Sequence, residues 1–117
     1  MIKLKSLLFE GRQLGKSLVQ GGFRDPIVII YRAMKETETE LHPNDYVTRS
    51  KQFAIEHSDH MAAVEGEMYH VVRYFVDPKY VFDADNPGEY FYNGSSVKGK
   101  EIHKSTEFLN ESNNQPH

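Results

Sequence analysis

The sequence contains no cysteine and no tryptophan, and no apolar run in it is long enough to cross a bilayer. Without cysteine the chain can form neither disulfides nor thiolate metal sites, so a reducing compartment such as the cytoplasm is expected. The formal charge of −3 provides no excess of cations for neutralising phosphates, which argues against a nucleic-acid partner. The first ten residues only briefly resemble a signal peptide, because their apolar part is short and no small-residue cleavage site follows. We therefore expect neither a nucleic-acid partner nor a membrane partner.

The residues that are present suit a single α+β domain. With 117 residues, of which 38% are hydrophobic, the chain can build one core but not two. Tyrosine and phenylalanine concentrate in the second half, where we expect the sheet. Three segments are predicted: an N-terminal helical segment over residues 1–24, a domain over 25–104, and a polar disordered tail over 105–117. The helix prediction rests on spaced leucines over residues 4–20, followed by two glycines.

The run Ile27–Arg32 predicts a strand buried on both faces, because four consecutive β-branched residues lead into an aromatic and an arginine. A cation at the end of such a strand is costly unless an anion meets it, so Arg32 suggests a ligand. The alternative is that Arg32 leaves the core and pairs with a surface carboxylate. The alternating polar run 35–40 that follows is expected to be an exposed loop or edge.

Further elements follow from local signals. Ser50 is a candidate N-cap for a helix from residue 51 to about 63, which Gly66 ends. Its apolar positions are expected at Phe53, Ala54, His57, Met61 and Val64. Strands are predicted over residues 46–48, 68–76, 80–82, 89–92 and 97–102, with 68–76 central in the sheet.

Three short motifs occur in a fixed order along the chain. Tyr31-Arg32 ends the first strand, Thr48-Arg49-Ser50 links a strand to a helix, and Glu89 follows a Pro-Gly loop and begins an aromatic strand. This ordered set, spanning about residues 27–102, resembles the ADP-ribosyltransferase superfamily, specifically its small phage-type and bacterial-type members. The resemblance implies an α+β fold with a small split β-sheet and a few helices.

The resemblance also implies a function: NAD-dependent transfer of ADP-ribose to a protein acceptor by a phage or bacterial effector, in the host cytoplasm if the protein is phage-encoded. Arg32 would hold the NAD phosphates, an aromatic ring would stack on nicotinamide, and Glu89 would stabilise the oxocarbenium-like transition state. The implied catalytic residues are Glu89, Arg32 and Ser50, and the implied NAD-binding residues are Tyr31, Arg32, Thr48, Ser50 and Phe53.

Alternatives accompany these assignments. Arginine-modifying members carry an acidic residue two positions before the catalytic glutamate, and Pro87 stands there in this chain. Glu101 is a rival for the catalytic carboxylate, and Ser50 could be a plain N-cap. A metal site at His57, His60 and His70 is disfavoured, since histidines three residues apart on a helix are common by chance.

The alternative function belongs to another class, a non-catalytic phage protein, structural or inhibitory, that uses the same fold as a protein-binding module.

Overall fold

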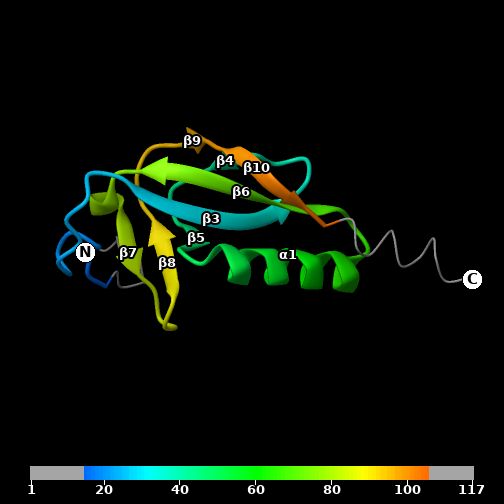
Figure 1. Ribbon diagram of the computed structural model, residues 1–117, viewed down its shortest axis with the longest axis horizontal. Coiled ribbons are helices and arrows are strands. Elements are labelled where there is room, and N and C mark those ends of the chain that lie inside the picture. The colour runs from blue at the N-terminus through cyan, green and yellow to red at the C-terminus, as the bar shows by residue number, and fades with distance from the viewer. Residues whose placement is uncertain (1–14, 106–117) are drawn as a thin grey trace, which may run out of the picture.

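The computed structural model describes residues 15–105 as an α+β fold, in which one α-helix lies against a mostly antiparallel sheet (Figure 1). The strands are β3 (Val28–Lys35), β4 (Glu40–Leu41), β5 (Asp45–Thr48), β6 (Tyr69–Val76), β7 (Val81–Asp83), β8 (Glu89–Tyr92), β9 (Val97–Lys98) and β10 (Lys100–Lys104). The helices are α1 (Lys51–Glu65) and the short 3₁₀ helix η1 (Pro78–Tyr80). The α+β prediction is confirmed, whereas a few helices were expected and the described residues form one α-helix and one 3₁₀ turn.

The main sheet has the strand order β10-β6-β3-β5-β8-β7, and β4 pairs with β9 in a separate small sheet. β6 lies inside the sheet, as predicted for the 68–76 run. β3 pairs with β6 along its whole length, but with β5 it shares the single pair Tyr31 with Thr48. The sheet therefore consists of two three-stranded halves that are joined at one position and then diverge.

The burial of β3 alternates, so the prediction of a strand buried on both faces was wrong. Val28 and Ile30 are buried, whereas Ile27 and Ile29 are 50% and 42% exposed. One face of β3 joins the main apolar core, formed with side chains such as Val72, and α1 begins too far along the strand to cover the other face at Ile29.

The segment that links β3 to β4 is largely exposed, as the prediction of an exposed loop or edge over residues 35–40 requires, and its backbone is also hydrogen-bonded to the core. The Tyr74 hydroxyl donates a hydrogen bond to the Thr39 carbonyl at 2.8 Å, and the His70 ring donates to the Glu38 carbonyl at 2.5 Å. Both donors are buried side chains of β6. The polar sequence of the segment gave no sign of these bonds, because they use its backbone carbonyls.

Helix α1 begins and ends where the sequence predicts. The Ser50 hydroxyl accepts the Phe53 backbone N–H at 3.1 Å, and Gly66 closes the helix with a φ of 69°. Of the predicted apolar positions, Ala54 is buried, but Phe53 is 47% exposed, and the other buried residues of the helix are Ser58 and Ala62. Small side chains let the helix approach the sheet closely, which the apolar spacing alone does not reveal.

Both predicted boundaries of the domain need correction within the described residues. Residues 15–24 are not helical; Ser17 forms a β-bridge with Phe82, and the Leu18 N–H donates to the Val81 carbonyl at 2.8 Å. Ser105, expected in the tail, is fully buried and its N–H donates to the Tyr69 carbonyl. The rest of the predicted helical segment, residues 1–14, and of the tail, residues 106–117, lies outside the described residues.

Gly99 provides a test of how tightly β10 joins the sheet. A Cβ atom at Gly99 would lie against the Arg73 carbonyl oxygen and 2.6 Å from Cδ1 of Tyr74, so Gly99→Ala forces β10 away from β6. We expect a loss of about 1–3 kcal/mol in the free energy of unfolding, measured by urea denaturation. Gly21→Ala is the matched control, because its nearest contact is an ordinary 3.5 Å. Equal stability of the two variants would contradict this packing.

Candidate functional site

Glu89 is placed by the turn that precedes it. The Glu89 N–H donates to the Asn86 carbonyl at 3.1 Å, and Gly88 has a φ of 85°. Together with Pro87, these features define a type II turn, in which proline and glycine occupy the two central positions that favour them. The Asn86 amide also donates to the Glu89 carboxylate at 3.2 Å. The Pro-Gly loop predicted from the sequence therefore fixes the first residue of β8.

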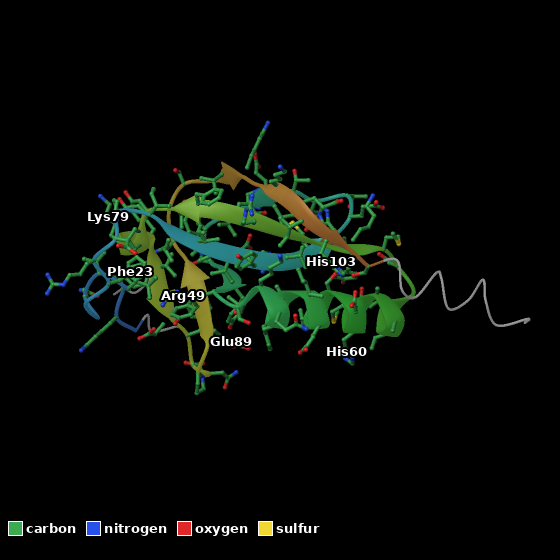
Figure 2. The ribbon with its side chains drawn as sticks, viewed as in Figure 1. Phe23, Arg49, His60, Lys79, Glu89 and His103 are labelled. Atoms are coloured by element: carbon green, nitrogen blue, oxygen red, sulfur yellow. The ribbon has the colours of Figure 1, made fainter. Side chains whose placement is uncertain are left out.

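Three predicted site residues form one row across three strands. Thr48 pairs with Tyr31 of β3 on one side and with Glu89 of β8 on the other. Directly opposite residues in antiparallel strands present their side chains on the same face, with Cβ atoms about 4.5–5.5 Å apart. Figure 2 shows Glu89 on β8 beside the N-terminal end of α1. The row therefore lies at the point where β3 and β5 begin to diverge.

Arg32 occupies the opening between the diverging strands. If the antiparallel register continued, Ala33 would lie opposite Tyr46. Instead, Nη1 of Arg32 donates to the Tyr46 carbonyl at 2.7 Å, and its Nε lies 3.7 Å from Oδ2 of Asp45. The Arg32 side chain is 28% exposed, so part of its guanidinium remains accessible to a ligand. The alternative, in which Arg32 pairs with a carboxylate, agrees with this geometry. Arg32 also lines a cavity, and the binding of a ligand there stays a prediction.

The cavity consists of two adjacent compartments, which share the lining residues Arg32, Ala33, Tyr46, His57 and Glu89. The narrow compartment, of about 120 Å³, is closed mainly by Tyr31, Thr48 and Phe53. The wide compartment, of about 460 Å³, is bounded by Met34, Lys35, Glu38, Met61 and Tyr69. The wide compartment alone has the size of a small-molecule site.

Tyr69 in the wall of the wide compartment is a hydrogen-bond donor at neutral pH. Burial raises its pKa to about 12, and the hydrogen bond to Glu65 contributes to the shift. Its hydroxyl donates to the Glu65 carboxylate at 2.7 Å. The Tyr69 hydroxyl is therefore engaged with α1.

The side chains of Ser50 and Thr48 stabilise the start of α1. The Ser50 hydroxyl caps α1 and does not line either compartment. Oγ1 of Thr48, a buried residue, accepts the Ser50 N–H at 3.0 Å and so fixes the start of the helix. The N-cap alternative for Ser50 agrees with this geometry, while Arg32, Glu89, Tyr31, Thr48 and Phe53 do line the cavity.

The rival carboxylate, Glu101, lies elsewhere. It belongs to β10, and its Oε1 accepts a hydrogen bond from Nδ1 of buried His70 at 2.7 Å. The three histidines weighed as metal ligands are separated: His70 is enclosed, His57 faces the cavity, and His60 lies on the side of α1 away from the sheet (Figure 2). Within residues 15–105, no group of three or more potential metal ligands comes together.

The sequence reasoning missed two residues that line both compartments. Tyr46 precedes Thr48 by two positions on the same strand, and His57 follows Phe53 by one helical turn. These two spacings place each missed residue on the same face as a residue already predicted for the site, so the sequence did contain a signal for them. It was overlooked because His57 was assigned to the core face of the helix.

No protein family model, curated protein or solved structure matches this chain. In the part of the chain that the structure describes, no helix is both long and apolar enough to pass through a bilayer. A function must therefore be inferred from the cavity and the residues that line it.

The role of Ser50 can be tested by separating stability from ligand binding. Ser50→Ala removes the acceptor for the Phe53 N–H and should lower the free energy of unfolding by about 1 kcal/mol. The NAD affinity that the family resemblance implies, measured by calorimetric titration, should be the same in this variant and in the control Ser96→Ala. A several-fold weaker affinity without any loss of stability would instead assign Ser50 to the ligand site.

Proposed function

We propose that this protein binds NAD in the cavity between β3 and β5 and transfers ADP-ribose to a protein acceptor. The observation that carries the proposal is the convergence of Arg32, Glu89 and aromatic side chains on one cavity, from segments far apart in the chain. The divergence of β3 from β5 after a single pair supports an ADP-ribosyltransferase-like split sheet.

Glu89 supplies the carboxylate that such a reaction needs. Breaking the bond between ribose and nicotinamide develops positive charge on the ribose, and a fixed anion nearby lowers the energy of that state. In this role Glu89 accepts a hydrogen bond from a ribose hydroxyl. The type II turn and the pairing with Thr48 hold the carboxylate before substrate arrives, so little reorganisation is needed at the moment of reaction.

Arg32 supplies the cation for the diphosphate. The hydrogen bond to the Tyr46 carbonyl and the nearby Asp45 carboxylate fix the plane of its guanidinium. The remaining N–H groups can donate to phosphate oxygens, which a planar fork matches well. Arg32 lines both compartments, so a diphosphate bound to it connects groups that occupy the two.

The two compartments suit the two ends of NAD. The narrow one, lined by Tyr31 and Phe53, accommodates the flat nicotinamide ring, and the wide one accommodates the larger adenosine half. Beyond Tyr31, the edge of β3 that faces the cavity has no partner strand among the described residues. Backbone groups of such an edge can pair with the carboxamide of nicotinamide.

The first test of this function is the substitution Glu89→Gln, which keeps the size of the side chain and removes its charge. We expect nicotinamide release from NAD to fall by about 10²–10³-fold while NAD affinity changes little, because the lost interaction acts mainly in the transition state. Release is measured by chromatography and affinity by calorimetric titration. Glu101→Gln is the matched control and should keep the wild-type rate. A fall in rate only in the Glu101 variant would reassign the carboxylate.

A second test addresses the phosphate-binding role of Arg32. Arg32→Lys retains one positive charge but loses the planar fork, so NAD should bind about tenfold more weakly. The control is Arg24→Lys at an exposed residue outside both compartments. Unchanged NAD affinity in the Arg32 variant, with the fold intact by circular dichroism, would remove Arg32 from the nucleotide site. Absence of NAD binding in the wild type would favour a protein-binding module instead.

A further inference from the structure

His57 is the one histidine of residues 15–105 that lines the cavity. It lies on α1, one turn after Phe53, and borders both compartments together with Arg32 and Glu89. Its ring is nearly parallel to the Phe53 ring, with an interplanar angle of 4° and centroids 6.1 Å apart. Within the described residues its nitrogens have no hydrogen-bond or ion-pair partner, so they are available to a ligand.

The other described histidines differ from His57 in this respect. His42, His70 and His103 each lie within 3.2 Å of a carboxylate oxygen, from Glu40, Glu101 and Asp59 respectively. His60 lies on the side of α1 away from the sheet (Figure 2) and lines neither compartment. An imidazole without a protein partner, placed beside a carboxylate and a guanidinium in a cavity, is a group that can exchange a proton with a bound molecule.

We propose that His57 is the general base that activates the acceptor, and that the acceptor is a hydroxyl group. This inference rests on the function proposed above. In the transfer, the bond between the ribose carbon and the nicotinamide nitrogen breaks, and its electron pair leaves with neutral nicotinamide. The acceptor oxygen forms a bond to the same carbon, and its proton passes to His57, which returns it to water.

The choice of a hydroxyl acceptor follows from which acceptors an imidazole base beside Glu89 can activate. A carboxylate acceptor has no proton to lose at neutral pH and needs no base. A guanidinium acceptor is a cation that keeps its proton in proteins, so an imidazole such as His57 does not activate it. A hydroxyl must lose a proton as it attacks, and an unpartnered imidazole is suited to remove it.

The charged and titratable groups around this part of the cavity come from every element near α1. They are Arg32 and Lys35 of β3, Glu38 of the following connection, Tyr46 of β5, Tyr69 of β6 and Glu89 of β8. Cations and carboxylates both occur, so no single sign of charge dominates the surroundings of His57. A general base accepts the proton in its neutral form, so the rate should fall where acid protonates that base.

The experiment uses the full chain, NAD and methanol as a small hydroxyl acceptor, and compares His57→Gln with the control His60→Gln on the same helix. Methyl ADP-riboside and nicotinamide are measured from acidic to alkaline pH. The His57 variant should lose about 10²–10⁴-fold in kcat and the acidic limb of the pH profile, with an unchanged KM for NAD. The His60 variant should behave as the wild type. Because both side chains are exposed, both variants should keep the wild-type unfolding temperature.

The outcomes separate this inference from the proposed function. If the wild type turns over NAD and the His57 variant has the same kcat and pH profile, His57 is not the base although the function stands. If agmatine, a guanidinium acceptor, is modified in preference to methanol, the hydroxyl assignment is overturned. If the wild type neither binds nor cleaves NAD, the proposed function fails, and the role of His57 fails with it.

Discussion

The hydrogen bond from Arg32 to the Tyr46 carbonyl is the interaction on which the candidate site depends. It occupies the place where the ladder between β3 and β5 would otherwise continue, and it satisfies a carbonyl that the divergence would leave without its strand partner. The same side chain thus bridges the two halves of the sheet where they diverge and presents a cation to the space between them.

The rest of the site is arranged around that opening by local features. The Pro87-Gly88 turn sets Glu89 at the beginning of β8, and the Ser50 cap starts α1 immediately after β5. Because the helix starts there, its first two turns place Phe53 and His57 over the cavity, while the small residues of α1 pack on the sheet. Caps and turns here determine which side chains reach the ligand space.

The features that could be predicted from the sequence were those encoded within a few residues. The cap at Ser50, the end of α1 at Gly66 and the turn before Glu89 each follow from side-chain and backbone preferences acting locally. The exposed face of β3 at Ile29 could not be predicted, because it depends on where a helix distant in sequence lies. The partners of His70 and the position of His57 were missed for the same reason, since each is defined by contacts between separate elements.

The pairing of Thr48 with Tyr31 and Glu89 has a consequence for how the chain can vary in length. Successive side chains of a strand point to opposite faces, so displacing β8 by one residue along β5 would turn the carboxylate away from the cavity. A displacement by two residues would restore the orientation of the Glu89 carboxylate but shift it along the strand. The chemistry of the site therefore depends on whether the number of inserted residues is odd or even. A single insertion inside β5 or β8 abolishes it, whereas insertions in the Ser95–Ser96 connection leave the row of Tyr31, Thr48 and Glu89 intact.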